Sequence, residues 1–383
     1  MNKIKFYATF LLWIGFLSIA QAADGNDPKN EFNPLINGAP SLTVAPDARG
    51  SGLGDVGAAT EPDIYSQYWN PAKYAFAYGK GGFGLSYTPW LKKMIDDIDM
   101  VYLAGYYKMG DSDRQAIGVS LRYFSTGKID VSRPGEAPIY DNISPYDVSV
   151  DLSYSLKFSE KFAGAVAFRY FYSDLGKIGE GYYPGSAFAA DIAGYYNNYT
   201  MLGDNECLFG LGFNISNIGS KISYNQGNSN VFLPANLRIG SSLLVPMDSY
   251  NTLSFNLDAN KYLFPAPPDM NGMDAEETQQ ARNDYYAMSS LSGIFKSFNE
   301  ARIALSFGME YAYNNHFFVR SGYFYEQPKN GNRQFFSVGG GFKLNAFQFD
   351  IAYLVSTVPY NPLDQALRLS LSFDMDGLKN LVK

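Results

Sequence analysis

The chain has little of the side-chain chemistry on which most enzymes and metal sites depend. It contains one cysteine, Cys207, and one histidine, His316. A single cysteine cannot form a disulfide within the chain, and one histidine without further ligands or a nucleophile gives neither a zinc site nor a catalytic triad. The patterns G-x-S-x-G and H-E-x-x-H are also absent. We therefore expect no catalytic residue, no metal and no cofactor.

Charge and long apolar runs are scarce as well. Charged residues make up 17% of the chain, below the roughly 25% of soluble domains. The net charge of −7 argues against a nucleic-acid partner, which needs a basic surface. Beyond residue 23 no apolar run reaches the roughly eighteen residues of a membrane helix. The chain is instead rich in aromatic residues, with 31 Tyr and 29 Phe, as in barrels with aromatic girdles at two lipid–water boundaries.

The beginning of the chain has the order of a secretory signal. Two lysines precede an apolar stretch over 6–20, and the small-residue triplet Ala20-Gln21-Ala22 ends it. This order predicts a signal peptide over 1–22 and a mature chain that starts at Ala23. The residue directly after the expected cleavage point is Ala23 and not a cysteine, so a lipid anchor is not expected.

Most of the remaining chain alternates between apolar and polar residues. From Tyr146 to Leu156 every second residue is apolar, and the residues between are Ser or Asp; this is the period of a β-strand. The polar faces are mostly Ser, Gly, Asn and Asp, with few Lys and Glu. The apolar faces carry almost no charge, as lipid requires, since Lys or Arg at mid-bilayer costs roughly 2–4 kcal/mol. A soluble sandwich shares the alternation, but a membrane barrel fits both details better.

The pattern predicts about fourteen strands, each near the nine to eleven residues that cross a membrane at a tilt. Their ranges are 82–89, 98–107, 115–125, 146–157, 161–172, 187–196, 207–216, 234–245, 251–259, 301–313, 316–325, 333–343, 346–355 and 365–374. Short turns alternate with long links, which predicts an all-β, up-and-down transmembrane barrel in the bacterial outer membrane. With both termini in the periplasm, the long links would be extracellular. The expected organisation is a signal peptide (1–22), an N-terminal periplasmic or plug segment (23–80), the barrel (81–375) and a short tail (376–383).

The inward-facing carboxylates are expected to pair with inward-facing arginines or to hydrate the lumen rather than to act in catalysis, because buried charges need partners. The carboxylates are Asp147, Asp151, Asp258, Glu310 and Asp350, and the arginines are Arg122, Arg169 and Arg320. His316 follows a short turn, and Cys207 lies at a strand edge without a basic neighbour to activate it.

The longest link, 260–300, starts with three prolines, which make its first part irregular. Asp274 followed by Glu277 then predicts a capped helix over Ala275–Met288. A link of this size is usually functional or disordered. Its tyrosines and methionines favour an ordered or partner-bound loop, and a loop folded into the barrel mouth as a plug is the alternative.

The segment before the barrel, 42–76, does not alternate. Small residues and glycines dominate it, which suits backbone packed closely inside a narrow lumen. Residues 52–57 formally match G-x-G-x-x-G, but no βαβ unit surrounds them, so a dinucleotide site is not expected. The residues of this segment that we single out as a plug motif are Asp47, Arg49, Gly54, Asp55, Asn70 and Pro71.

The stretch from Asp47 to Lys73 also carries a family resemblance. It contains Asp-Ala-Arg-Gly, then Gly-Asp-Val-Gly-Ala-Ala-Thr, then Ser-x-x-Trp-Asn-Pro-Ala-Lys. With the barrel after it, this stretch resembles the FadL-type outer-membrane proteins and, among them, the PorV (LptO) family of the type IX secretion system. The match covers nearly all of the mature chain. Asn-Pro-Ala alone is common to many FadL-type barrels, and the whole stretch is more specific. The resemblance implies a fourteen-stranded barrel with an N-terminal plug.

The resemblance further implies a shuttle without chemistry of its own. PorV-like proteins take cargo with a C-terminal β-sandwich signal domain from the translocon barrel (Sov/SprA-like). They deliver it to a cell-surface sortase complex (PorU-like), which removes the signal and attaches the cargo to lipopolysaccharide. A FadL-type channel for hydrophobic solutes shares the fold and remains an alternative. A lipopolysaccharide deacylase is a third, which would need a catalytic constellation on the outer rim.

Under the shuttle hypothesis we predict that cargo docks on the links 260–300, 326–332 and 356–364. Aromatic and methionine side chains dominate interface cores. The candidates are therefore Phe264, Met270, Met273, Tyr285, Tyr286 and Tyr360.

Overall fold

The computed structural model describes residues 36–90, 98–110, 113–131, 140–176, 182–227, 230–268, 270, 272–358 and 363–382. The expected signal peptide, residues 23–35 and the docking candidate Tyr360 lie outside these ranges. Within them, no helix combines the length and the apolar character needed to cross a membrane.

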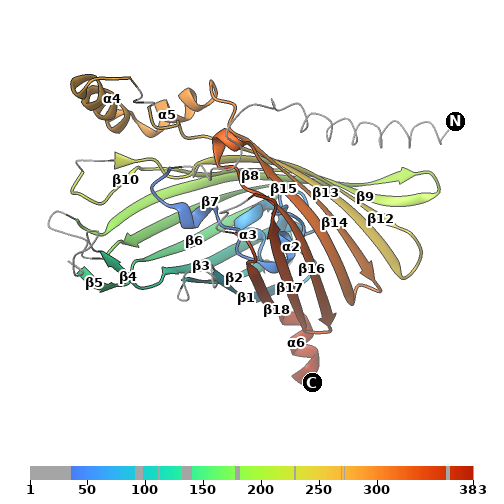
Figure 1. Cartoon of the computed structure of the whole chain (residues 1–383). Coiled ribbons are helices and arrows are strands. Elements are labelled where there is room, and N and C mark those ends of the chain that lie inside the picture. Colours follow the sequence, from blue (N-terminus) through green and yellow to red (C-terminus); the bar gives the residue numbers. More distant parts are fainter. Residues whose placement is uncertain are drawn as a thin grey trace.

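Fourteen antiparallel strands form a closed barrel, which confirms the predicted fold (Figure 1). The barrel closes between its first strand β1 and its last strand β18, where Leu85 lies opposite Leu371. The strands are β1 (Gly81–Trp90), β2 (Ile98–Met109), β3 (Gln115–Thr126), β6 (Tyr146–Lys157), β7 (Phe162–Asp174), β8 (Gly185–Leu202), β9 (Asn205–Gly219), β12 (Asn236–Pro246), β13 (Asn251–Tyr262), β14 (Ile303–Tyr313), β15 (Phe317–Glu326), β16 (Gln334–Leu344), β17 (Phe347–Ser356) and β18 (Leu367–Asp374).

The hairpin of β8 and β9 departs most from the predicted strand ranges. Its pairing continues to Leu202 and Asn205, beyond the predicted ends at 196 and 207. The turn contains Gly203 at φ 67, a left-handed conformation that glycine adopts without steric cost. Residues 197–200 read Asn-Asn-Tyr-Thr, so the alternation that marks the other strands is missing here.

The two faces of the barrel wall follow the sequence alternation. In β6, Val150 and Leu152 are exposed on the outside, whereas Asp151 and Ser153 are buried on the inside. Apolar side chains therefore cover the outer surface, as in a barrel surrounded by lipid, and polar side chains line the lumen.

Residues 36–80 occupy the lumen through four short helical elements. These are η1 (Pro40–Thr43), α2 (Ala48–Gly52), α3 (Ser66–Trp69) and η2 (Pro71–Phe76), and Figure 1 shows α2 and α3 within the barrel. Helix α2 contacts β15 to β18, whereas η2 contacts β6 and β7 on the opposite wall. The segment therefore bridges the lumen from wall to wall, and we call residues 36–80 the plug.

The long links carry additional structure at one end of the barrel. Helix α4 (Ala275–Ala287) confirms the predicted helix: the Asp274 side chain accepts from the Glu277 N–H, and the Glu277 side chain accepts from the Asp274 N–H. Sequence reasoning missed the other elements, which are α5 (Ser290–Ser297), η3 (Pro328–Asn330), the strand pair β4 (Ile129–Val131) and β5 (Tyr140–Ile143), and the pair β10 (Ile222–Ser223) and β11 (Asn230–Val231).

The two ends of the described chain lie at opposite rims. The Gly38 N–H donates to the Phe232 carbonyl at 2.8 Å, and Phe232 belongs to the long link between β9 and β12. The C-terminal helix α6 (Met375–Val382) lies at the short-turn rim, where the Asp376 side chain accepts from the Lys80 N–H at 2.8 Å. We expected both termini at the short-turn rim. The helical tail lies there, and the expected mature N-terminus at Ala23 lies outside the described residues.

Candidate functional site

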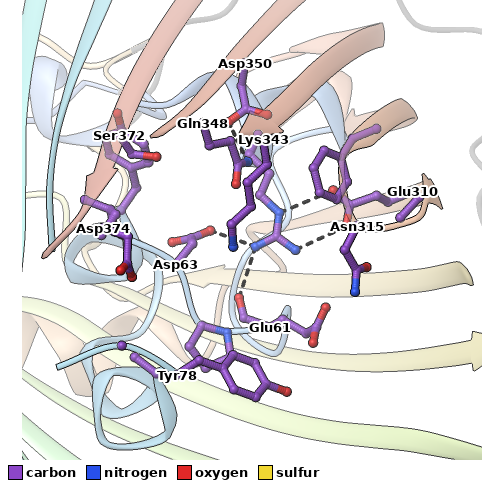
Figure 2. Close-up of a pocket in the computed structure, with 18 of the residues that line it drawn as sticks. Glu61, Asp63, Tyr78, Glu310, Asn315, Lys343, Gln348, Asp350, Ser372 and Asp374 are labelled. Atoms are coloured by element: carbon purple, nitrogen blue, oxygen red, sulfur yellow. Dashed lines mark hydrogen bonds and ion pairs between the residues drawn. The ribbon is translucent and has the colours of Figure 1, made fainter. Parts of the chain in front are cut away.

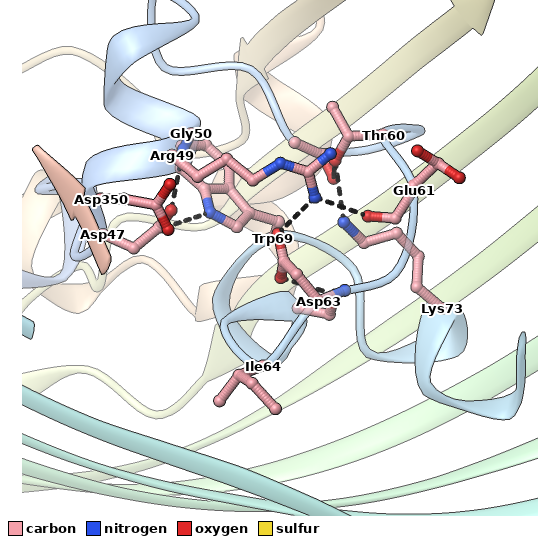
Figure 3. A network of polar contacts seen from close by, with 12 residues as sticks. Asp47, Arg49, Gly50, Thr60, Glu61, Asp63, Ile64, Trp69, Lys73 and Asp350 are labelled. Carbon is pink, nitrogen blue, oxygen red and sulfur yellow. Dashed lines mark hydrogen bonds and ion pairs between the residues drawn. The ribbon is translucent and has the colours of Figure 1, made fainter. Parts of the chain in front are cut away.

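The plug motif is built around a buried Asp47–Trp69 pair (Figure 3). The Asp47 carboxylate accepts from the Trp69 Nε1–H at 2.6 Å and from the Gly50 N–H at 2.8 Å, which caps α2. A Cβ at Gly50 or Gly57 would overlap the Trp69 ring, so both positions need glycine. Burial and, to a smaller extent, nearby Asp63 raise the pKa of Asp47 to about 6. This pair fixes the two halves of the plug to each other.

Arg49 connects the plug to the barrel wall. Its guanidinium lies 3.0 Å from the Asp63 carboxylate and 3.1 Å from the Glu310 carboxylate on β14. Glu310 also accepts from Arg320, which pairs with Asp350 at 2.6 Å. The predicted pairing of the inward charges Glu310, Asp350 and Arg320 is thus present, and a plug residue completes it.

Asn70 and Pro71 direct the last turn of the plug. The Asn70 side chain donates to the carbonyls of Ala58 at 2.8 Å and Gly194 on β8 at 2.9 Å. Its oxygen accepts from the Ala72 N–H at 3.1 Å, which caps η2. Pro71 takes the first helical position, where its missing N–H costs nothing.

Gly54 and Asp55 seat the plug against the wall. Gly54 has φ 76, and a Cβ there would lie 2.6 Å from the Tyr323 nitrogen. Asp55 pairs with Arg368 on β18 at 3.1 Å. On the far wall, Asp258 accepts from the N–H groups of Gly57 and Ala58 at 2.8 and 2.9 Å. The plug is therefore bonded to the barrel at several points around its circumference.

The other inward charges divide into two groups. Arg169 pairs with Asp151 at 2.5 Å and with Asp191 at 3.2 Å, as the sequence predicted for Asp151. Arg122 instead donates to the carbonyls of Ser41 and Val44 in the plug. The last predicted carboxylate, Asp147, accepts from the Ser41 hydroxyl at 2.5 Å. Arg122 and Asp147 thus have plug carbonyl and hydroxyl groups as partners, where the sequence predicted an ion pair or a hydrated lumen.

Two cavities flank the plug. The larger has a volume of about 410 Å³ and lies at the short-turn rim (Figure 2). It is lined by plug residues, by β14 to β18 and by residues of β2, β12 and β13. The smaller has a volume of about 50 Å³ and lies toward the long links, lined by Trp69, Arg238 and Arg333 among others. Among the described residues the two cavities share no lining residue.

The predicted docking residues on the longest link do not form one exposed surface. Phe264 and Tyr285 are only 1% and 7% exposed, in a cluster with Phe232 and Tyr262. Tyr286 packs against this cluster, and the Met270 sulfur accepts from the Arg282 Nε–H at 3.4 Å. Met273 is 41% exposed. Phe264 and Tyr285 therefore hold the link in place, and in this conformation they offer almost no surface to a partner.

The exposed apolar residues of this link lie on α5 instead. Leu291, Phe295 and Phe298 are 63%, 73% and 59% exposed. Their spacing places them on one face of the helix, with Ile294 beside them. This face is a signal that the sequence did contain, in the run Leu-Ser-Gly-Ile-Phe-Lys-Ser-Phe, but an eight-residue helix is too short to predict with ease.

Two lysines fix the helices of this link to the barrel. Lys221 donates to the carbonyls of Tyr285, Tyr286 and Met288 at 3.2, 3.1 and 2.9 Å, at the C-terminal end of α4. Lys261 donates to the carbonyls of Ser297 and Glu300 at the end of α5. Cations at helix C-termini satisfy free carbonyls and oppose the negative end of the helix dipole.

His316 and Cys207, whose side chains are of types often used in catalysis, lie on different hairpins of the barrel. The His316 ring contacts the Asn314 carbonyl in a short turn, and buried Cys207 contacts the Asn205 carbonyl at 3.7 Å. Across the described ranges, no group of three His, Cys, Asp or Glu side chains could hold a metal ion.

These features define an outer-membrane β-barrel whose lumen is closed by an N-terminal plug. A sequence model of the family "Type IX secretion system protein PorV" matches residues 27–269, more than half of the chain. The chain belongs to the PorV family, which confirms the resemblance seen in its sequence. No curated protein matches it.

Solved structures share the fold at low sequence identity. The toluene transporter TodX of Pseudomonas putida has a TM-score of 0.50 and 12% identity, over 85% of this chain and 96% of TodX. A TodX deletion mutant gives 0.51 at 13% identity, over 85% and 98% of the two chains. A FadL homologue of Pseudomonas aeruginosa is also similar, with a TM-score of 0.43 and 11% identity over 90% and 99%. At these identities the first two similarities establish a shared barrel fold and nothing about a ligand.

Proposed function

We propose that the protein is the outer-membrane shuttle of a type IX secretion system. In this role it binds the C-terminal signal domain of exported cargo and receives the cargo from a SprA-like translocon barrel. It then delivers the cargo to a PorU-like sortase complex at the cell surface, where attachment to lipopolysaccharide occurs. Membership of the PorV family is the observation that carries this proposal. A shuttle needs a docking surface and no nucleophile.

The proposed orientation has the long links outside the cell and the short turns in the periplasm. The rhythm of short and long connections supports it, because outer-membrane barrels have short periplasmic turns and longer extracellular loops. The expected division into signal peptide, plug segment (23–80), barrel (81–375) and tail is part of this proposal.

We place the cargo-docking surface on α5 and the adjoining α4. Three large apolar side chains, Leu291, Phe295 and Phe298, are exposed on α5. In a water-facing link such a cluster is a typical mark of a protein interface. Exposed carboxylates on and before α4 flank it; they are Asp274, Glu276, Glu277 and Asp284. This arrangement fits a cargo surface that has an apolar patch beside basic residues.

The buried aromatic cluster supports a preformed docking surface. Phe232, from a different link, packs against Tyr285 with ring centroids 5.4 Å apart, and Gly293 of α5 leaves no room for a side chain against the Phe232 ring. With Lys221 and Lys261 at the helix ends, α4 and α5 have defined positions before any partner arrives. A preformed surface loses less conformational entropy on binding. Of the docking residues predicted from the sequence, we place Met273 and Tyr286 at the edge of this surface.

A cellular experiment tests the role and the surface together. Deletion of the protein is expected to leave cargo with its C-terminal signal uncleaved and unattached. Complementation with the triple variant Leu291→Ser, Phe295→Ser, Phe298→Ser should fail to restore cleavage. The matched control replaces Tyr182 and Tyr183, which are exposed on another long link, by Ser and should restore it. Normal surface cargo in the deletion strain would refute the proposed function.

A channel for hydrophobic solutes is the second candidate, favoured by the fold shared with the toluene transporter TodX. The plug argues against it, because charged residues of the plug and wall cross-link the lumen. Five carboxylates and three cations are among the residues that line the larger cavity. Uptake of an apolar solute that is lost on deletion, and retained by the triple α5 variant, would favour the channel.

A further inference from the structure

The larger cavity has the form of a binding site rather than of a passage. Its volume of about 410 Å³ lies within the roughly 300–1,000 Å³ of ligand pockets. Tyr78, Asn315 and Lys343 are exposed side chains at its rim, and Arg49, Glu310 and Arg320 line it where the plug meets the wall (Figure 2). The smaller cavity toward the long links shares none of its described lining.

Polar groups without a partner line this cavity. In the part of the chain that the structure describes, neither the Glu61 carboxylate nor the Lys343 ammonium has an ion pair or hydrogen bond. The cavity thus presents a free carboxylate acceptor and a free ammonium donor to whatever occupies it.

The charge of the lining favours a cationic occupant. The cavity contains five carboxylates, Glu61, Asp63, Glu310, Asp350 and Asp374, and three cations, Arg49, Arg320 and Lys343. Both arginines are already paired with carboxylates on two sides, so the excess charge is negative. Burial raises the pKa of Glu61 above its ordinary value, and a bound cation would offset that desolvation.

We propose that this cavity binds an extended, amine-bearing peptide segment of a protein on the short-turn side of the membrane. Glu61 receives the ammonium group, and the exposed ring of Tyr78 lies at the rim, where a cation can approach its face. Asn315, Gln348 and Ser372 supply the donors and acceptors that a peptide backbone needs.

Other ligand classes fit this lining less well. An apolar solute would leave the polar groups without partners, at a cost in free energy. A phosphate or nucleic-acid ligand would meet an excess of negative charge. The described residues around the cavity lack a metal-holding group of three. The inference does not depend on the shuttle function, because it concerns the opposite end of the barrel from α5.

The experiment uses the purified full-length barrel in a zwitterionic detergent and a trilysine amide peptide as the probe. Isothermal titration calorimetry is expected to give saturable binding. Glu61→Gln should weaken it at least about fivefold, from the loss of one charge contact, and Lys343→Gln should strengthen it. Asp113→Asn is the matched control: Asp113 lies in a short turn and its carboxylate is 55% exposed, so removal of its charge should leave affinity unchanged. Each variant is first checked for the folded barrel by its heat-dependent gel mobility.

Three results would overturn the proposal. One is the absence of trilysine binding up to millimolar concentration. A second is equal weakening by Glu61→Gln and Asp113→Asn, which would mean attraction to general surface charge. The third is equally tight binding of the peptide with its amines acetylated, which would mean that the ammonium group is not recognised.

Discussion

Removal of the Glu310 charge is the sharpest test of how the plug is held. Glu310 accepts from Arg49 of the plug at 3.1 Å and from Arg320 of the wall, and the three side chains are 7%, 13% and 0% exposed. In Glu310→Gln, two buried guanidinium groups lose their shared counter-charge. Loss of the only partner of a buried charge costs about 3–5 kcal/mol, but Arg49 keeps Asp63 and Arg320 keeps Asp350. We therefore expect a destabilisation of about 2 kcal/mol, between this range and that of an exposed pair, with Arg49 and its plug segment the first to open.

The measurement is urea unfolding of the purified barrel, followed by tryptophan fluorescence, to which buried Trp69 contributes. Limited proteolysis of the plug is a second readout. The control is Asp113→Asn, which removes the Lys80–Asp113 pair at the short-turn rim, with side chains 32% and 55% exposed. Exposed pairs contribute roughly 0–1 kcal/mol. If Glu310→Gln costs no more than this control and the plug resists protease as in the wild type, the ion-pair network does not hold the plug.

Three further predictions concern the plug and the long link. Gly322→Val should lower the yield of folded barrel, measured by heat-dependent gel mobility, because the valine side chain would overlap the Leu53 backbone. Gly340→Val is the control, since a Cβ there has only the Phe318 carbonyl oxygen nearby, at 3.6 Å. Lys221→Ala should raise hydrogen exchange in α4, since it removes three hydrogen bonds from the helix end, and unchanged exchange would contradict the anchoring role. The pKa of Asp47 is raised from 3.8 to about 6 in the folded state, so the protonated form is favoured by folding. The stability that protonated Asp47 contributes is therefore complete below about pH 4 and is lost as pH rises through 6. Relative to Asp47→Asn, the wild-type free energy of unfolding should therefore fall by about 3 kcal/mol between these values, and parallel pH profiles would contradict it.

The strands and the plug could be predicted because their signals are local. The alternation over Tyr146–Leu156 fixes which side chains face lipid, and Asp274 with Glu277 fixes the start of α4. The pairing of Glu310 and Asp350 with Arg320 followed from the rule that buried charges need partners. The glycines of the segment 42–76 indicated close backbone packing, and Gly54 and Gly57 occupy such positions.

The burial of the predicted docking residues could not be foreseen because it depends on contacts between distant links. Composition selects aromatic residues as interface candidates but does not tell which of them another link covers. Phe232 packs against Tyr285 from more than fifty residues away in the sequence, and this contact removes Tyr285 from the surface. The partners of Arg122, which are carbonyls of the plug, could not be predicted for the same reason. Nor could the contact of Gly38 with Phe232, which places the start of the plug at the long-link rim.

Direct binding of a cargo signal domain to the purified barrel tests the central claim most directly. A C-terminal signal domain from the same organism is titrated against the wild type, against the triple variant at Leu291, Phe295 and Phe298, and against the control at Tyr182 and Tyr183. We predict that the wild type and the control bind with equal affinity and that the triple variant binds at least about tenfold more weakly, a loss of about 1.4 kcal/mol. If the wild type does not bind, or if all three proteins bind equally, the proposed shuttle with its docking face on α5 is wrong.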